Sequence, residues 1–305
     1  MVKLITALFF LLLIVTNSFS LNLRPIIGIV SETTTEDHSY IAASYVKYIE
    51  SAGARVVPII NNITQDELKD LFGSINGVLF PGGGSSLVES AYLEVAKTIF
   101  ELAKQANDEG DYFPLWGTCL GFQLLCVLQS GTNHILSSFD SEDYSIPLNF
   151  TDAANASRLF SMYTPEGMGW LSSEPITMNN HQYGVSPDSF KSMSSLTEFY
   201  TILSTNFDRK GSEFISSIEA IHYPFYGVQW HPEKNTFEWT TAESINHSYH
   251  AVSIAQTAAN FLVSEARKSD HHFTSEEKEM DSLIYNYEPT YTGKVSHSFE
   301  QEYEF

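Results

Sequence analysis

The chain has 305 residues, of which 43% are hydrophobic, enough for one large core or two modest domains. It carries 37 acidic residues against 16 Lys and Arg, which gives a formal net charge of −21 at pH 7. This charge removes the electrostatic basis for binding nucleic acids or anionic membranes, so we exclude both as partners.

The first twenty residues are typical of a secretory signal peptide. Lys3 supplies a positive start, residues 4–15 form an apolar stretch, and Ser18 and Ser20 are small residues suited to a cleavage site. The apolar stretch is too short to span a bilayer comfortably, and no later segment is a candidate. We therefore expect residues 1–20 to be removed and the mature protein to have no membrane span.

Apolar runs then alternate with segments of helical periodicity. Strands are predicted at residues 25–30, 55–60, 77–84 and 113–118, and helices at residues 39–53, 65–72, 87–106 and 119–128. In the first helix, Ile41, Tyr45 and Ile49 recur at helical spacing and form a core stripe. This alternation predicts an α/β fold with a mostly parallel central sheet and helices on both faces.

The pattern loosens between residues 133 and 219. Two strand-like runs, TILST at 201–205 and EFISSIEA at 213–220, predict a small antiparallel extension of the sheet. A last strand is expected in FYGVQWHPEKN, beginning at Phe225 and ending at His231.

A long helix is predicted at residues 241–268, and the remaining residues are polar and then tyrosine-rich. We find no internal repeat and no Gly/Ser linker. The simplest division is one catalytic domain at residues 21–268, with residues 269–305 as a C-terminal extension that packs on the same domain.

The corner between the fourth strand and its helix carries the motif Gly117-Thr118-Cys119-Leu120-Gly121. A nucleophile between two such glycines is typical of a strained strand-to-helix elbow. The helix start favours a thiolate, and the N–H of Leu120 faces the same space. An N–H from the Gly82–Gly84 turn, most simply that of Gly83, would complete an oxyanion hole. A buried structural thiol is the alternative at this point.

A thiolate nucleophile needs a general base and a third group that orients the base. His231 follows an apolar strand at the sheet edge where the elbow is expected. Glu233 stands two residues on and is suited to holding the imidazole in its useful tautomer. His181, in MNNHQYG, is the other candidate, although its spacing alone favours a surface-loop histidine.

The cysteines and the N-glycosylation motifs give information on the cellular compartment of the protein. Cys119 and Cys126 are the only cysteines; on one helix they lie about 10.5 Å apart along the axis, beyond disulfide reach, so both are expected to be free. Cys126 is expected to be a packed core thiol. The predicted glycosylation sites are Asn62, Asn149, Asn155 and Asn246. Together with the signal peptide, these sites predict the secretory pathway, ending in the extracellular space, a lysosome or a vacuole.

Two segments, PLWGTCLGFQLL and YGVQWHPEKN, resemble the class I glutamine amidotransferase-like superfamily. Within it, DYFPLWGTCLGF, PLNFT, SEARKSDHHF and the late LIYNYEPTYTG are similar to the γ-glutamyl hydrolase family, whose members are secreted or lysosomal and act on folate polyglutamates. The resemblance covers nearly all of the chain after residue 20. It implies a flavodoxin-like three-layer fold and cysteine-dependent hydrolysis of γ-glutamyl peptide bonds through a thioester.

The resemblance also assigns roles to residues. It implies that Cys119 is the nucleophile, that His231 is the acid–base and that Glu233 orients it, with His181 near the substrate. It implies a folate or antifolate poly-γ-glutamate as the small-molecule substrate, no cofactor, no metal and a possible homodimer. Such a substrate is a polyanion; the basic residues available to meet it are Arg209, Lys210 and Lys234, and the sequence assigns none of them to the site.

Other functions remain open. A glutamine amidotransferase-type amidase would share the same three residues but would be cytosolic and need a partner domain. A papain-like protease lacks its local cysteine signature here. A secreted binding glycoprotein of the same fold without activity would be expected to have lost catalytic residues, and all three are present.

Overall fold

The computed structural model describes residues 21–35 and 38–305, so the predicted signal peptide lies outside the described residues. Within them, the largest sheet has eight strands in the order β4-β1-β5-β6-β12-β11-β10-β8. Its first five strands are mutually parallel: β4 (Arg55–Ile59), β1 (Ile26–Val30), β5 (Val78–Phe80), β6 (Leu115–Thr118) and β12 (Phe225–Val228). Apart from Arg55 at the start of β4, these strands are buried along their length, as expected of a sheet covered on both faces.

The remaining strands of this sheet are antiparallel: β11 (Glu213–Ala220), β10 (Tyr200–Phe207) and the short β8 (Asn149–Phe150). The predicted antiparallel extension is therefore confirmed. The pairing places β12, which precedes His231, between the parallel half and the antiparallel half.

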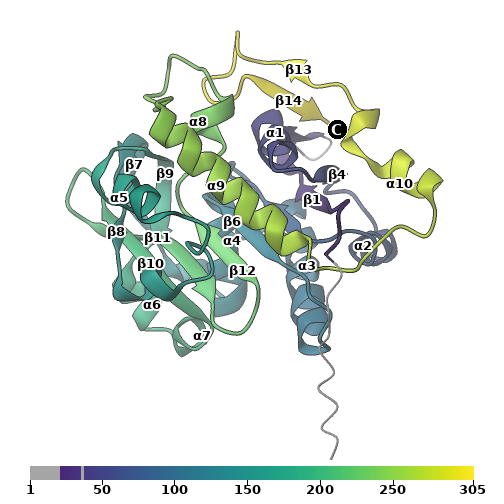
Figure 1. Cartoon of the computed structure of the whole chain (residues 1–305), viewed down its shortest axis with the longest axis horizontal. Coiled ribbons are helices and arrows are strands. Elements are labelled where there is room, and N and C mark those ends of the chain that lie inside the picture. The colour runs from purple at the N-terminus through teal and green to yellow at the C-terminus, as the bar shows by residue number, and fades with distance from the viewer. Residues whose placement is uncertain (1–20, 36–37) are drawn as a thin grey trace, which may run out of the picture.

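Helices cover both faces of the sheet, and each face has its own apolar core (Figure 1). One face packs against α2 (Gln65–Phe72), α3 (Ala91–Asp108), α4 (Leu120–Ser130), α6 (Pro187–Lys191) and α7 (Ser194–Thr197). The other packs against α1 (Ala43–Ser51), α5 (Pro165–Ser173) and α9 (Tyr249–Ala266). The predicted three-layer α/β fold is confirmed. In the described part of the chain, no helix is both long and apolar enough to cross a membrane.

Three predicted helices begin later than expected. The helix predicted from residue 87 begins after Ser90, and the one predicted from residue 241 begins after Ser248; each serine side chain accepts the backbone N–H three residues on. These serines satisfy an N–H that has no partner within the helix and so fix its start. The helix predicted from residue 39 begins at Ala43, because the preceding residues form a strand.

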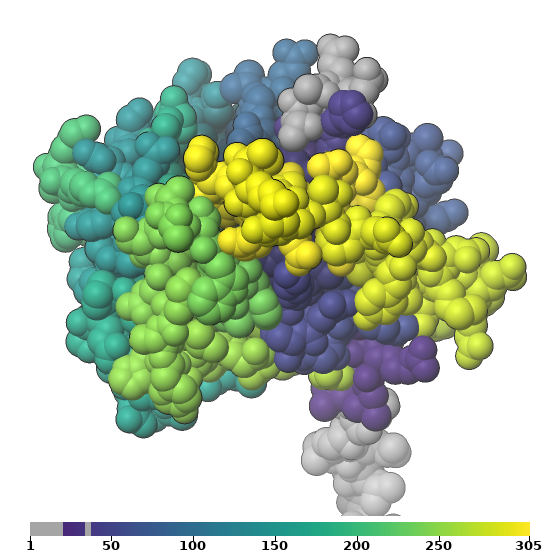
Figure 2. Space-filling view, turned by 90° about the horizontal axis from the view of Figure 1, so that it is seen from above, coloured from purple at the N-terminus to yellow at the C-terminus, as the bar shows by residue number. Residues whose placement is uncertain are grey.

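That strand belongs to a second, antiparallel sheet that the sequence did not indicate. It contains β2 (Glu32–Thr35), β3 (His38–Ala42), β14 (Gln301–Glu304) and β13 (Thr290–Tyr291). Ala42 lies opposite Glu302, so the C-terminal segment returns to the N-terminal part of the chain. Figure 2 shows these yellow C-terminal residues lying across the surface beside the purple N-terminal region.

A separate antiparallel pair, β7 (Leu136–Ile146) and β9 (Thr177–Val185), was also missed. It contributes a wall beside the carboxyl end of the main sheet. The remaining short elements are α8 (Lys234–Phe237), α10 (Glu276–Ser282) and 3₁₀ turns at Asn133–Ile135, Asp152–Ala156 and Ile284–Asn286.

Candidate active site

Cys119 occupies a strained corner between β6 and α4. Its φ of 53° and ψ of −104° lie in a region that residues other than glycine rarely adopt. A Cβ on Gly117 would overlap the carbonyl oxygen of Gly121, and a Cβ on Gly121 would overlap that of Phe80. Both glycines are therefore required for the close approach of the helix to the sheet, and the corner holds the cysteine at the carboxyl end of the parallel strands.

Backbone hydrogen bonds fix this corner to its two neighbouring strands. The Cys119 N–H donates to the Val228 carbonyl at 2.8 Å, and the Gly121 N–H donates to the Pro81 carbonyl at 3.1 Å. Because Val228 ends β12 and Pro81 follows β5, the nucleophile candidate is held between the segments that carry the glycine turn and His231.

His231 and Glu233 form a buried pair beside the elbow. The His231 Nδ1–H donates to Glu233 Oε1 at 2.7 Å, and only 4% and 0% of the two residues is exposed. Burial alone lowers the pKa of His231, but the Glu233 carboxylate, the Cys119 sulfur and hydrogen bonds to both residues outweigh it and raise the pKa to about 10. The imidazole is therefore charged at neutral and acidic pH.

Tyr45 is part of the same site. Its hydroxyl accepts the Gly82 N–H at 2.7 Å and lies 3.4 Å from His231 Nδ1; burial, followed by the charge of Glu233, raises its pKa well above the usual range. The sequence showed Tyr45 only as a member of a helical core stripe. Its role depends on the packing of α1 against the site, which helical periodicity does not reveal.

One amide of the glycine turn, that of Gly83, has no hydrogen-bond partner in the described part of the chain. The Gly82 N–H is bound by Tyr45, and the N–H groups of Gly84 and Ser85 bind the carboxylate of Glu32. Among the described residues, neither the Gly83 N–H nor the Leu120 N–H has a hydrogen-bond partner. These are the two amides that the sequence analysis placed in the oxyanion hole, and both residues line the same cavity as Cys119.

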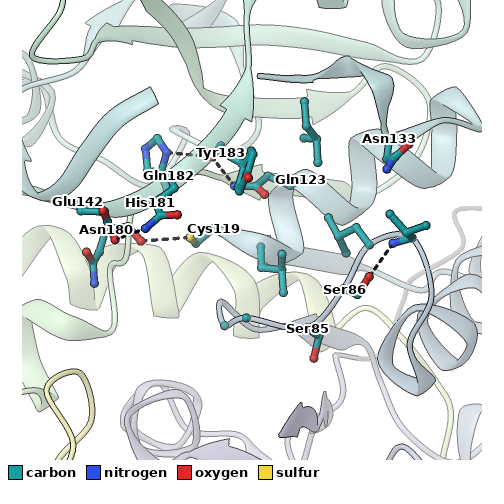
Figure 3. Close-up of a pocket in the computed structure, with 16 residues that line it drawn as sticks. Ser85, Ser86, Cys119, Gln123, Asn133, Glu142, Asn180, His181, Gln182 and Tyr183 are labelled. Carbon is teal, nitrogen blue, oxygen red and sulfur yellow. Dashed lines mark hydrogen bonds between the residues drawn. The ribbon is translucent and has the colours of Figure 1, made fainter. Parts of the chain in front are cut away.

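A cavity of about 760 Å³ opens at Cys119, a size typical of small-molecule sites (Figure 3). The glycine turn and residues 85–88 form one side, and residues 180–183 of β9 form the other, with Cys119 between them. Val88 and Tyr183 are 72% and 54% exposed and lie at its rim, while Gln123 donates to the Tyr183 carbonyl and so ties α4 to β9. Neither Lys nor Arg is among the described residues that line the cavity.

His181 is not a surface-loop histidine, so that interpretation was wrong. It lies in β9 and is 4% exposed, with Nδ1 3.0 Å from the Tyr183 carbonyl and Nε2 3.2 Å from Asn179 Oδ1. Burial lowers its pKa to about 3, so the ring stays neutral. Its ring packs edge-on against Phe214, which supports the cavity wall to which His181 belongs.

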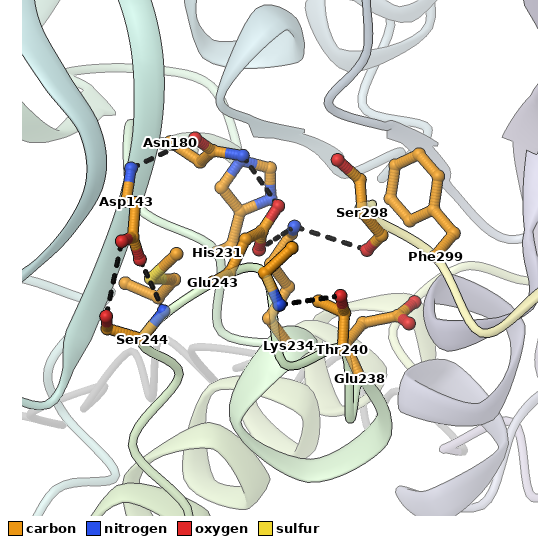
Figure 4. Close-up of polar contacts among 12 residues, drawn as sticks. Asp143, Asn180, His231, Lys234, Glu238, Thr240, Glu243, Ser244, Ser298 and Phe299 are labelled. Atoms are coloured by element: carbon orange, nitrogen blue, oxygen red, sulfur yellow. Dashed lines mark hydrogen bonds and ion pairs between the residues drawn. The ribbon is translucent and has the colours of Figure 1, made fainter. Parts of the chain in front are cut away.

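The basic residues named from the sequence do not enter the cavity. Lys234 is 1% exposed; its Nζ donates to Glu243 Oε2 at 2.5 Å and to the Ser298 carbonyl at 3.4 Å (Figure 4). Glu243 in turn accepts a hydrogen bond from the side-chain amide of Asn180. The backbone carbonyl oxygen of Asn180 lies 3.9 Å from the Cys119 sulfur. Lys234 thus stabilises the Asn180 side of the cavity wall through Glu243, from outside the cavity.

Arg209 and Lys210 lie outside the cavity as well. Arg209 donates to the carbonyls of Glu142 and Asp143 in β7, and Lys210, whose side chain is 76% exposed, is paired with Asp140. Both charges are therefore engaged on the outer side of the β7–β9 wall.

The remaining predicted positions are placed as follows. Both cysteines are free, and Cys126 is fully buried in the core, where burial raises the pKa of its thiol. Asn62, Asn149 and Asn155 are exposed. Asn246 is half-buried, and its amide donates to the Pro175 carbonyl at 3.1 Å. Within the described residues, no group of three or more His, Cys, Asp or Glu side chains is arranged to hold a metal ion.

A comparison of solved structures finds the same architecture. The chain is similar to "Trypanosoma brucei CTPS - glutaminase domain with bound acivicin", with a TM-score of 0.54 and 15% identity over 80% of this chain and 95% of that one. At this level of identity the likeness concerns the fold, and it agrees with the class I glutamine amidotransferase-like architecture expected from the sequence.

Sequence comparisons identify nearer relatives. The model of the peptidase C26 family matches residues 25–233. The chain is 50% identical to the γ-glutamyl hydrolase of Mus musculus over 92% of this chain and 90% of that protein. It is 43% identical to γ-glutamyl hydrolase B of Dictyostelium discoideum over 100% of this chain and 90% of that protein. It is 41% identical to γ-glutamyl hydrolase 1 of Arabidopsis thaliana over 94% of this chain and 84% of that protein. This chain therefore belongs to the peptidase C26 family.

Proposed function

We propose that the protein hydrolyses γ-glutamyl peptide bonds in folate poly-γ-glutamates and related chains, with Cys119 as the nucleophile. The observation that carries this proposal is the strained Cys119 at the mouth of a substrate-sized cavity, backed by the charged His231–Glu233 pair. The γ-glutamyl hydrolases that resemble the chain along most of its length supply the substrate class.

In the first half-reaction the Cys119 thiolate attacks the γ-carbonyl carbon of a glutamyl residue. The electron pair of the C=O bond moves to oxygen, and the N–H groups of Leu120 and Gly83 stabilise that oxyanion. The C–N bond then breaks, and the His231 imidazolium gives its proton to the leaving amine. The products are a thioester on Cys119, which holds the acyl part of the chain, and a released glutamate or glutamate oligomer with a free amine.

In the second half-reaction water attacks the thioester, and the now neutral His231 accepts its proton. The C–S bond breaks, the γ-carboxyl group is released, and the thiolate–imidazolium pair is restored. Glu233 keeps the imidazole oriented through the bond to Nδ1 in both steps. No proton or electron is left over.

Recognition of an anionic chain by this cavity rests on neutral donors. Besides Cys119, the polar side chains of the lining are those of serine, asparagine and glutamine residues, together with His181, Tyr183 and one carboxylate, that of Glu142. Acidic conditions protonate part of the glutamate carboxyls on both partners and so reduce the repulsion between them. We therefore assign the activity to mildly acidic pH.

The compartment and organisation belong to the same proposal. We assign the chain to the secretory pathway. The exposure of Asn62, Asn149 and Asn155 supports glycans at these residues. A glycan on Asn246 would first require its side-chain amide to lose the hydrogen bond to the Pro175 carbonyl. Residues 21–268 and the C-terminal extension form one catalytic unit, supported by the pairing of β14 with β3. A homodimer remains a prediction.

The test is incubation of the purified protein with a folate pentaglutamate at pH 5, with the product lengths followed over time. We expect shortened folates, a loss of at least about 1,000-fold in Cys119→Ala and full activity in the matched control Cys126→Ala. Glutamine serves as a second substrate. Activity retained in Cys119→Ala, or release of ammonia from glutamine without cleavage of the pentaglutamate, would contradict the proposal.

A further inference from the structure

Glu32 is a buried carboxyl group that the mechanism above does not use. It begins β2, directly beyond the carboxyl end of β1, and only 1% of the residue is exposed. A buried carboxylate is costly unless it is well hydrogen-bonded or paired with a cation. The groups that act on it are the hydroxyl and backbone N–H of Ser85 and the backbone N–H of Gly84, rather than a Lys or Arg, so its position calls for an explanation.

The amides that bind Glu32 come from the glycine turn. Its Oε2 accepts the Ser85 N–H at 2.9 Å, and the Gly84 N–H also donates to the carboxylate. The Ser85 hydroxyl oxygen accepts the N–H of Thr33 at 2.9 Å, which adds a second link between β2 and the turn. Together with the bond from the Ser85 side chain to Glu32, these hydrogen bonds hold the turn against β2.

The turn also lies in direct contact with this carboxyl group. A Cβ on Gly83 would overlap the Cδ and Oε2 atoms of Glu32. Glycine is thus required at the residue whose N–H has no partner among the residues that the structure describes. The carboxylate packs against one side of Gly83 and prevents the turn from moving in that direction, while the cavity lies on the other side.

Opposing effects act on the pKa of the Glu32 carboxyl group. Burial, the largest effect, raises the pKa of Glu32 to about 7, and the hydrogen bonds from Ser85 and Gly84 lower it in part. Oε1 has no hydrogen-bond partner among the described residues, so it is the natural site for a proton at acidic pH, while Oε2 continues to accept from Ser85. The phenols of Tyr40 and Tyr92 are the titratable groups whose pKa this charge raises.

We propose that Glu32 is a positioning residue for the oxyanion hole: by binding the amides of Gly84 and Ser85, it holds the turn so that the Gly83 N–H is presented to the substrate carbonyl. This inference rests on the proposed function, since an oxyanion forms only if Cys119 attacks a carbonyl. It concerns the transition state, so Glu32 is expected to affect turnover more than substrate binding.

The experiment compares Glu32→Ala and Glu32→Gln with Glu219→Gln. Glu219 is a matched control because its carboxylate accepts a backbone N–H at the same distance, 2.9 Å from Leu159, in β11, away from the turn. Loss of one oxyanion donor typically lowers kcat by about 100- to 1,000-fold, so misplacing it in Glu32→Ala is expected to lower kcat by at least tenfold with KM little changed. Glu32→Gln, which keeps one acceptor, is expected to fall in between, and the control to remain at the wild-type value.

A second readout separates positioning from general damage. A γ-glutamyl aldehyde adds to the Cys119 thiolate: a C–S bond forms, the C=O bond becomes C–O, and the oxygen lies in the oxyanion hole, with the proton of the pair on His231 available to it. Its affinity reports the oxyanion hole, whereas alkylation by iodoacetamide reports only the thiolate. We expect Glu32→Ala to weaken the aldehyde by the same factor as kcat and to leave the alkylation rate, counted per folded molecule, unchanged.

The outcomes are distinguishable. If wild type is active, Cys119→Ala is not, and Glu32→Ala retains wild-type kcat and aldehyde affinity, the role of Glu32 is refuted while the proposed function stands. Equal losses in aldehyde affinity and alkylation rate would show general disruption of the site and would also refute it. If wild type does not cleave γ-glutamyl bonds, the proposed function itself fails.

Discussion

Replacing Glu233 by glutamine changes the charge of the site and little of its shape. The carboxylate accepts the His231 Nδ1–H at 2.7 Å in a fully buried setting, and His231 has a pKa raised to about 10 by this group and by Cys119. Two unit charges about 4 Å apart interact by about 4 kcal/mol at an effective dielectric constant near 20. That energy corresponds to about three pKa units, so the pKa of His231 is expected to fall from about 10 to about 7 in Glu233→Gln.

The consequence is a pH-dependent defect. At pH 5 the His231 imidazolium, the proposed proton donor to the leaving amine, is still fully populated in the variant, and the remaining loss of activity is expected to reflect poorer orientation of the ring. At pH 8 only about one-tenth of a group with a pKa near 7 is protonated, whereas the wild type is almost unaffected. The ratio of variant to wild-type kcat is therefore expected to be about tenfold lower at pH 8 than at pH 5.

The assay is hydrolysis of a γ-glutamyl peptide at saturating substrate, measured from pH 5 to pH 8 with the folded fraction checked by circular dichroism. Glu174→Gln is the matched control, because Glu174 binds His250 Nδ1 at 2.8 Å on the surface and is expected to leave the profile unchanged. A variant-to-wild-type ratio that stays constant from pH 5 to pH 8 would refute the electrostatic account of His231 and Glu233.

Three further predictions concern the rest of the molecule. Gly121→Ala should lower the free energy of unfolding by about 3 kcal/mol or more, since its Cβ meets backbone; in the control Gly169→Ala it meets nothing within 4 Å, so chemical denaturation should show no loss. In ¹⁵N NMR, His181 should stay neutral and His231 protonated from pH 5 to pH 8, because their pKa values are about 3 and about 10; a titration midpoint inside this range would contradict the assignment. Burial raises the pKa of Glu238 to about 7 in the folded protein. Its proton therefore contributes stability that is fully present below about pH 4.5 and is lost as the pH rises through 7. Glu238→Gln should remove this contribution to the decline, measured as the difference in melting temperature between pH 5 and pH 8.

The sequence was sufficient for features that depend on neighbouring residues in the chain. The parallel strands read as short apolar runs because they are buried on both faces, and the elbow could be recognised because its two glycines flank Cys119 directly. His231 could be placed at the sheet edge because it follows the end of β12 by three residues.

Features that depend on distant parts of the chain were not predictable in this way. Glu32 and Tyr45 reach the glycine turn through tertiary packing, and their own neighbours in sequence carry no mark of that contact. His181 looked like a loop residue because β9 alternates buried and exposed positions irregularly where its pairing with β7 shifts register. Polar strands of this kind carry a weak period-2 signal.

The pairing of β14 with β3 joins residues 302 and 42, which stand at opposite ends of the described chain. Closing so long a loop is slow, and it cannot start until residues 301–304 have been synthesised. The same terminal stretch supplies the Ser298 carbonyl to Lys234 and the Glu300 N–H to Glu238, next to the segment that bears His231 and Glu233. A nascent polypeptide that lacks residues 298–304 therefore cannot make these contacts, so the packing behind His231 and Glu233 is completed only after this stretch has been synthesised.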